Sequence, residues 1–287
     1  FRLGYGSYND MRLIASNYTK VNEQLGLSFS GNYHHNDGFF TNLHTHKKAD
    51  KLDNGAGRIG LTWKPAAHWT TRFITSYEYS NQGGYPYGLY NADKGTTEAV
   101  NYNNEGLYRR NLLTSGINIR YNGPHISFNS QTSYQYIQDK MGIDQDFSPR
   151  NIFYGQNKIR QHMYCQEFTV KSVNKSRYHW ITGAFVFRQT INRKVDLSRF
   201  TDTTRHLTNS GIPTQGIAFY HQSTLDLLQG LSCSVGLRYD YEHARCDFSK
   251  VQQPLNGNGE TKSLEQFNRS LHFGQFTPRF SMQYLSC

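Results

Sequence analysis

The sequence predicts an all-β protein, an antiparallel transmembrane β-barrel, and three observations carry that prediction. Stretches of the chain alternate apolar and polar residues, short and long connections follow one another in turn, and aromatic residues gather at the ends of the stretches. The clearest stretch is 231–245, in which Leu237 and Tyr239 alternate with Arg238 and Asp240. Successive side chains of a strand point to opposite faces, so each such strand has one apolar and one polar face.

About twelve stretches follow this pattern along the chain. A tilted strand of about 9–11 residues crosses a bilayer, so we expect these stretches to be membrane strands. In two of them, 178–188 and 215–228, both faces carry apolar residues, and the sequence leaves open which face meets lipid. In order, the expected strands are 1–6, 8–19, 23–35, 52–64, 69–80, 107–121, 125–139, 159–173, 177–191, 215–228, 231–245 and 276–285.

The connections alternate between short turns and long, polar loops. A soluble β-sandwich has no reason to sort its loops in this way, whereas outer-membrane barrels have short periplasmic turns and long extracellular loops. A soluble all-β fold is the alternative. The short turns are 20–22, 65–67, 122–124, 174–176 and 229–230, and the long loops are 36–51, 81–106, 140–158, 192–213 and 246–275.

Aromatic residues are expected to form two belts at the two membrane surfaces, as they do in other outer-membrane barrels. Next to the short turns lie Trp63, Trp69, Tyr121, Tyr178 and Trp180, and next to the long loops lie Tyr33, Tyr79, Tyr136 and Tyr241.

Composition excludes several classes of protein. The 287 residues have a mean hydropathy of −0.73 but include 21 Tyr, 18 Phe and 3 Trp, too many aromatics for a disordered chain. No apolar run approaches the roughly 20 residues of a membrane helix. The net charge is +10, but Lys and Arg are spread along the chain without a nucleic-acid motif, so no nucleic-acid partner is expected. The four cysteines show no paired spacing, and no disulfide is assigned.

Several motifs resemble a recurrent pattern of TonB-dependent outer-membrane receptors. These are GLRYDY at 236–241, FTPRFSMQY at 276–284, LGYGSYND at 3–10 and SFSGNYHHNDGFF at 28–40. The strand pair at 57–88 is most similar to the ferric-siderophore members of the family. The similarity covers the whole chain in order, although each motif alone is weakly specific.

The resemblance implies a barrel of 22 strands with an N-terminal plug folded inside it. This sequence shows about twelve strands, no plug, no TonB-contacting segment and no terminal aromatic residue, since it ends in LSC. We therefore expect residues 1–287 to be a partial barrel domain, the N-terminal half of the barrel region of a larger receptor, with the plug domain and the C-terminal strands absent. The alternative is a self-contained barrel that acts as a passive outer-membrane pore, since barrels of 8 strands and more can close.

The resemblance also implies a function and its partners. The expected protein is integral to the outer membrane of a Gram-negative bacterium and takes up a ferric siderophore or a similar scarce ligand. The expected partners are outer-membrane lipid, lipopolysaccharide, the ligand, and the TonB–ExbB–ExbD complex, which would act through the missing plug region. Iron enters only as part of the transported chelate, so no resident cofactor is expected. Whether the ligand is a siderophore, haem, a glycan or a peptide stays open.

The expected ligand-binding residues lie on a long loop and among the arginines. In QGGYPYGLYNAD, paired glycines and a proline would fold the chain back and present Tyr85, Tyr87 and Tyr90, which could stack on a chelate or only pack the loop. The arginines could attract an anionic ferric complex or pair with acids on the same face. They are Arg238 together with Arg58, Arg72 and Arg120 on the expected lumenal face, and Arg109 and Arg110 at a loop base.

Metal and catalytic sites are not expected. The pair His44 and His46 in HTHKK lacks a third ligand at a known spacing, so an exposed polar loop is the simpler interpretation. Asp240 and Glu242 share a face while His243 points to the other, and no matching nucleophile is present, so no enzyme is predicted.

Overall fold

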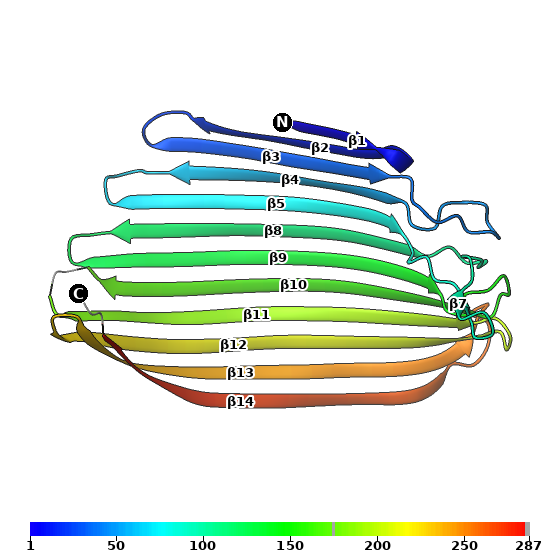
Figure 1. Cartoon of the computed structure of the whole chain (residues 1–287). Coiled ribbons are helices and arrows are strands. Elements are labelled where there is room, and N and C mark those ends of the chain that lie inside the picture. The colour runs from blue at the N-terminus through cyan, green and yellow to red at the C-terminus, as the bar shows by residue number, and fades with distance from the viewer. Residues whose placement is uncertain (174–175, 285–287) are drawn as a thin grey trace.

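The computed structural model describes residues 1–173 and 176–284 and shows a single curved sheet (Figure 1). Twelve antiparallel strands pair in their order along the chain, so each hydrogen-bonds to its neighbours in sequence. The all-β antiparallel fold and the number of strands are as predicted. Within the described part of the chain, no helix is long and apolar enough to span a bilayer.

The strands lengthen from the N-terminal to the C-terminal side of the sheet. A 3-10 turn at Ser7–Asn9 links the first two strands, and β6 and β7 form a separate small ribbon inside one loop. The bounds are β1 Arg2–Gly6, β2 Asp10–Lys20, β3 Leu25–Asn36, β4 Leu52–Trp63, β5 Trp69–Gly83, β6 Tyr90–Asn91, β7 Thr96–Thr97, β8 Leu107–Asn122, β9 Ile126–Asp144, β10 Phe153–Ser172, β11 Tyr178–Arg199, β12 Thr204–Leu228, β13 Leu231–Pro254 and β14 Lys262–Tyr284.

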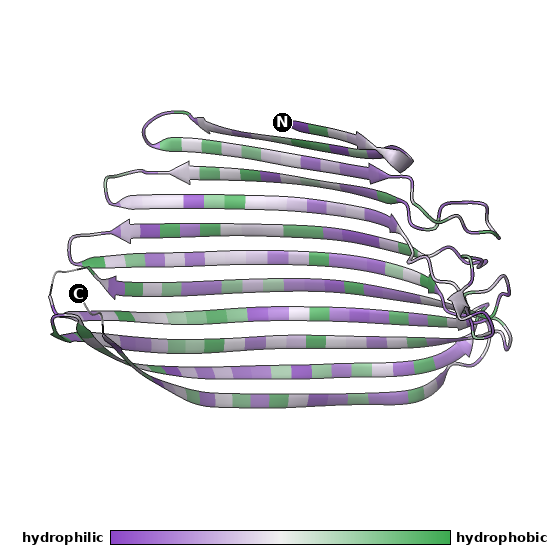
Figure 2. Cartoon of the chain, viewed as in Figure 1, coloured by the Kyte–Doolittle hydropathy of each residue, from purple (hydrophilic) through white to green (hydrophobic). Residues whose placement is uncertain are grey.

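The strand register gives the sheet one apolar and one polar face, and green and purple bands alternate along the strands in Figure 2. The apolar face contains the cross-strand row Leu27, Leu61, Phe73, Ile117, Thr132, Gln166, Val186, Ile217 and Tyr241. The adjacent row on the polar face contains Thr62, Arg72, Asn118, Gln131, Glu167, Phe185, Ala218 and Asp240. The sequence left open which face of 178–188 and 215–228 meets lipid. The register places Val186, Ile217 and Phe219 of these strands on the apolar face.

The aromatic residues expected in two belts all lie on the apolar face. Register places the set near the short turns and the set near the long loops on the same side of the sheet. At the short-turn end, for example, the rings of Trp69 and Tyr121 lie 4.9 Å apart.

No second layer covers the apolar face within the described residues. Phe219, Val235 and Leu237 on this face are 53%, 57% and 52% exposed, and the few buried apolar residues lie mostly in the loops. A soluble sandwich would bury such side chains against a second sheet. A single-layered sheet with one apolar and one polar face is the arrangement found in the walls of outer-membrane barrels.

Three of the predicted long loops are wrong in their length. The segments 140–158, 192–213 and 246–275 are largely strand, and the gaps between strands shrink to 145–152, 200–203 and 255–261. Here both faces of the hairpins carry polar side chains, which resemble loop residues in the sequence. The backbone ladder continues regardless, because its hydrogen bonds do not require apolar side chains. The loops at 36–51 and 81–106 are confirmed, except that β3 extends to Asn36 and β5 to Gly83.

The long connections and the hairpins at 140–158, 192–213 and 246–275, here named the raised hairpins, lie at one end of the sheet, the loop end. The short turns lie at the other end, the turn end (Figure 1). β1 and β14 form the two edges of the sheet. Almost every residue of β14 is exposed. An edge strand presents unpaired backbone groups, which a hydrocarbon environment does not tolerate.

A candidate ligand site at the loop end

Two loops that are far apart in the sequence fold together into a small cap, defined here as residues 36–51 and 84–106. Its core is formed by Ala49, Val100 and Tyr102. Asn42, which is 1% exposed, ties the loops together: its Nδ2 donates to the carbonyl of Tyr102 at 2.8 Å, and the amide of Tyr102 donates to its Oδ1 at 3.2 Å. The cap is therefore an ordered structure with its own hydrogen bonds.

Glycines let the cap approach the sheet closely. A Cβ built on Gly83 would lie 2.0 Å from the carbonyl oxygen of Ala49, and one on Gly84 would lie 2.6 Å from the Cα of Gly106. Real side chains do not tolerate such distances, so the paired glycines allow both ends of the loop to meet. The chain folds back here as the QGG sequence predicts.

The cap and the ends of β8 and β9 enclose a cavity of about 400 Å³. Five aromatic residues contribute to its wall, namely Tyr85, Tyr87, Tyr102, Tyr108 and Phe147. The ring of Tyr87 lies 5.8 Å from that of Tyr85 and 5.0 Å from that of Phe147. Such a wall can hold a flat or aromatic ligand by ring contacts.

Tyr102 is the unusual member of this wall. It is 3% exposed, and its hydroxyl is buried without a hydrogen-bond partner among the described residues. Burial, and then the charges of Asp144 and Asp50, raise the pKa of Tyr102 to about 12. The phenol therefore stays protonated, and a ligand that supplied an acceptor would remove the cost of burying an unpaired hydroxyl.

Two acidic residues of the cavity are already held by backbone amides. The carboxylate of Asp144 accepts hydrogen bonds from the amides of Asn104 at 3.1 Å and Phe147 at 3.0 Å, and Asp50 accepts from Phe40 at 2.9 Å. Burial raises the pKa of Asp144, although these hydrogen bonds oppose it. Both acids thus fix the loops, and the hydroxyl of Tyr108 donates to Asp139 at 3.5 Å, so the buried hydroxyl of Tyr102 is the polar group left to meet a ligand.

The predicted tyrosines separate in the structure. Tyr85 and Tyr87 line the cavity, whereas Tyr90 lies on β6 and does not line it. Sequence reasoning did not identify Tyr102, Tyr108 or Phe147. Nothing local marks these residues, because they reach the cavity from segments that only the fold brings together.

The predicted arginines lie on different faces, and three of the six, Arg109, Arg110 and Arg238, have side-chain partners among the described residues. Arg58, Arg72, Arg120 and Arg238 share the polar face. Arg110 pairs with Asp139 at 2.7 Å, and Arg238 pairs with Asp240 at 2.7 Å. Pairing with nearby acids, the alternative considered from the sequence, is thus observed for these two.

Arg109 lies on the opposite, apolar side of β8 from Arg110, because successive residues of a strand alternate. Its Nε donates to Oδ1 of Asn81 at 3.2 Å.

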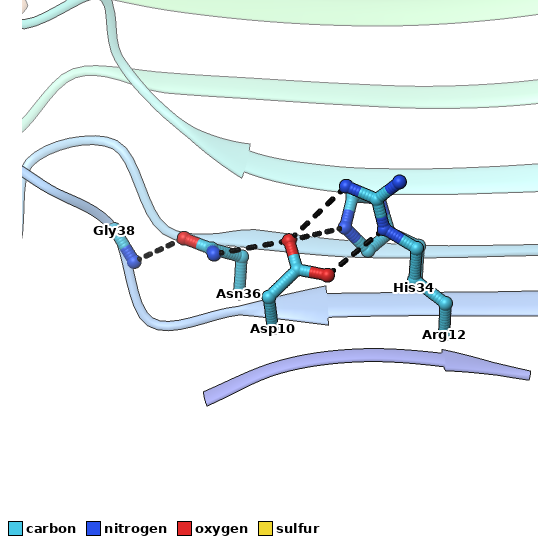
Figure 3. A network of polar contacts seen from close by, with 5 residues as sticks. All are labelled: Asp10, Arg12, His34, Asn36 and Gly38. Atoms are coloured by element: carbon cyan, nitrogen blue, oxygen red, sulfur yellow. Dashed lines mark hydrogen bonds and ion pairs between the residues drawn. The ribbon is translucent and has the colours of Figure 1, made fainter. Parts of the chain in front are cut away.

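A polar network closes the loop end of the first hairpins (Figure 3). The carboxylate of Asp10 accepts hydrogen bonds from Arg12 at 2.8 Å, His34 at 3.1 Å and Asn36 at 3.3 Å, and Oδ1 of Asn36 accepts from the amide of Gly38 at 2.7 Å. These residues lie outside the cavity and hold the chain where β3 passes into the cap.

The histidines considered for metal or acid–base chemistry do not converge. Residues 1–173 and 176–284 contain no group of three or more side chains arranged to hold a metal ion. Register puts Asp240 and Glu242 on the polar face and His243 on the other, where its ring stacks on that of His272 at 4.4 Å.

No family model matches the chain. Among solved structures, 97% of it superposes on the ferric yersiniabactin uptake receptor FyuA from Yersinia pestis, with a TM-score of 0.80 and 13% identity, covering 43% of that chain. It also matches the siderophore receptor PiuA from Acinetobacter baumannii, with a TM-score of 0.69, 10% identity, and coverage of 98% of this chain and 46% of that one.

The ferric-catecholate import receptor Fiu from E. coli K12, in its open form, matches with a TM-score of 0.68 and 10% identity, over 96% of this chain and 50% of the other. The chain spans half or less of the length of these three proteins. At identities this low, the likeness shows the fold alone: the sheet has the fold of part of these uptake receptors.

Proposed function

We propose that this chain is part of the barrel wall of a TonB-dependent receptor, integral to the outer membrane of a Gram-negative bacterium, that takes up a ferric siderophore or a similar scarce ligand. The observation that carries the proposal is the loop-end cavity with its aromatic wall and the unpaired hydroxyl of Tyr102. The exposed apolar face supports the membrane location, and the fold shared with siderophore receptors supports the ligand class.

The cavity would bind its ligand through rings and phenols. The rings of Tyr87 and Phe147 offer apolar faces to a chelate, while Tyr102 donates a hydrogen bond to one of its oxygens. Asp50 and Asp144 disfavour a strongly anionic ligand at this position. We therefore expect a ligand that presents aromatic or neutral donor groups here and carries its metal as cargo, with no resident cofactor in the protein.

The remaining expectations concern the whole receptor. Further strands would pair with the edge strands β1 and β14 and complete the barrel, so residues 1–287 would form one part of the barrel domain. A plug inside that barrel would receive energy from the TonB–ExbB–ExbD complex. Lipid and lipopolysaccharide would surround the apolar face.

The test is equilibrium binding of radioactive iron chelates to the protein purified in detergent. The probes are ferric yersiniabactin, ferric citrate and a ferric catecholate. We expect saturable binding of at least one chelate at nanomolar to micromolar concentration. Absence of saturable binding, together with discrete conductance steps in planar bilayers, would refute the proposal and favour the passive pore.

A pair of variants tests the cavity itself. Tyr102→Phe removes a hydroxyl that has no partner in the described residues, so it should leave the fold intact or stabilise it while weakening binding about tenfold, the equivalent of one hydrogen bond. Tyr90→Phe, outside the cavity, is the matched control and should bind as the parent does. Equal affinities for the two variants would remove Tyr102 from the site.

A further inference from the structure

Four cations lie directly beside one another on the apolar face, near the loop end. Arg109 on β8 pairs in register with Lys140 on β9, which pairs with Lys158 on β10, which pairs with Lys194 on β11. Directly opposed like charges destabilise neighbouring strands. An arrangement of this kind therefore favours an anion that bridges the strands.

No carboxylate of the described residues serves as that anion. None of the four cations forms an ion pair in the described part of the chain, although Arg109 donates to the neutral side chain of Asn81. The neighbouring acids on this face have partners of their own: Asp53, two strands from Arg109 in the same row, lies 2.7 Å from His35. Asp196 lies 3.8 Å from Arg205, and Asp247 lies 2.7 Å from Arg245.

On β8 to β11, the rows below these cations on the same face contain further cations and no acid. Arg160 and Arg188 add positive charge, and the other side chains are neutral or histidine. Passing from the cations toward the turn end, the next rows on β8 to β11 are Asn111, Gln138, Arg160 and Asn192, then Leu113, Tyr136, His162 and Thr190, then Ser115, Tyr134, Tyr164 and Arg188.

A long groove passes over three of these lysines. Its volume is about 1060 Å³, and its lining residues form three consecutive cross-strand rows on β9 to β14. The two outer rows contain Lys140, Lys158, Lys194 and Arg160 and share the apolar face, so the groove runs between them with the backbone of the middle row as its floor. Beyond the lysines the walls carry hydrogen-bonding side chains such as Asn209 and Gln266, and they include Asp247, whose charge is paired with Arg245.

The position of the groove relative to the aromatic belt identifies its level in the membrane. Just below it, the rings of Tyr134 and Tyr164 lie 4.7 Å apart, and those of Tyr136 and His162 lie 4.9 Å apart. Tyrosine belts mark the interface between hydrocarbon and head groups. At about 7 Å per row along a strand, the cations stand at the level of lipid head groups.

We propose that this groove binds a membrane lipid with a phosphorylated sugar head group, in the leaflet that faces the loop end. The cations meet the phosphates, the amide side chains meet the sugar hydroxyls, and the apolar face below meets the acyl chains. The inference rests on the membrane placement in the proposed function, but it concerns the lipid-facing side of the sheet and a ligand distinct from the transported one.

The test compares the parent with the variant Lys140→Gln/Lys158→Gln/Lys194→Gln, each purified in detergent, by native mass spectrometry with bisphosphorylated lipid A. At about 1 kcal/mol for each lysine, the loss of three should weaken binding roughly 100-fold. The matched control is Lys20→Gln/Lys64→Gln/Lys171→Gln near the turn end, which should bind as the parent does. Equal binding by the first variant and the parent would overturn the inference.

Two further measurements separate the outcomes. In detergent without lipid, the groove variant should melt at or above the temperature of the parent, because like charges have been removed, whereas bisphosphorylated lipid A should raise the melting temperature of the parent alone. Monophosphorylated lipid A should bind more weakly, and inorganic phosphate should not compete at equal concentration. Full competition by phosphate would show a simple anion site and overturn the lipid assignment.

The chelate-binding assay keeps this inference distinct from the proposed function. Lipid binding that depends on the three lysines, without binding of any chelate, would support the groove and refute the uptake function. Chelate binding without lysine-dependent lipid binding would do the reverse.

Discussion

Replacing Asn42 with alanine should release the cap from its closed form. Asn42 is 1% exposed and makes three hydrogen bonds: two with the backbone of Tyr102, at 2.8 and 3.2 Å, and one accepted from the amide of His44 at 3.0 Å. Alanine leaves the buried amide and carbonyl of Tyr102 unpaired. At about 1–3 kcal/mol for each unpaired group, with some relaxation, the closed cap should lose about 2–4 kcal/mol.

Hydrogen exchange followed by mass spectrometry measures this loss directly. At 1.4 kcal/mol for each factor of ten, peptides from 36–51 and 84–106 should exchange roughly 30- to 1000-fold faster in Asn42→Ala. Peptides from the middle of β9 and β10 should be unchanged, because their ladder does not depend on the cap. Asn91→Ala, at an exposed amide of the β6 ribbon, is the control. Unchanged exchange in the cap of Asn42→Ala would refute the role of this side chain.

Burial raises the pKa of Asp144, so the native cap holds the Asp144 proton more tightly than an unfolded chain does. The stability that this proton gives the cap should be complete below the ordinary pKa of Asp and should fall as the pH rises through the raised pKa. Asp144→Asn should abolish that slope in protection factors for 145–152 measured at several pH values, and an unaltered slope would contradict the assignment. Gly83→Ala places a Cβ 2.0 Å from the carbonyl oxygen of Ala49 and should destabilise the closed cap by about 1–3 kcal/mol. Limited proteolysis should then cut the variant within 84–106. The control Gly57→Ala, whose Cβ would have no atom within 4 Å, should remain resistant. Trp69→Ala loses the contact with Tyr121 at 4.9 Å and should lower stability in urea titrations in lipid vesicles by at least about 0.5–1.5 kcal/mol, without changing chelate affinity; a loss of affinity would show that the turn end acts on the cavity.

The sequence alone was sufficient for the two-faced strands and their order. Alternation is a local property with a period of two, so the placement of Trp69, Tyr121 and Tyr136 on one face could be predicted without tertiary information. Four of the five short turns could be predicted for the same reason, because two alternating stretches separated by a few polar residues can hardly form anything except a hairpin. The fifth, at 174–176, lies largely outside the described residues.

The length of the strands in the raised hairpins, from β9 to β14, could not be predicted from hydropathy. Near Lys194 and Asn209, the strands project beyond the apolar band and carry polar side chains on both faces. Their side chains therefore resemble those of a loop, although their backbones remain paired. Only the register distinguishes a raised hairpin from a long loop, since it shows whether each amide has a partner on the neighbouring strand.

The sequence determined the fold and its two faces, and the tertiary structure decided the sites. Asn42 and Tyr102 are 60 residues apart in sequence, yet their contact builds the cap and its cavity. Arg109, Lys140, Lys158 and Lys194 appear as scattered cations in the sequence, because each lies on a different strand. Pairing of four strands in one register aligns their charges, and this happens because a ladder fixes residues opposite one another whatever their separation along the chain.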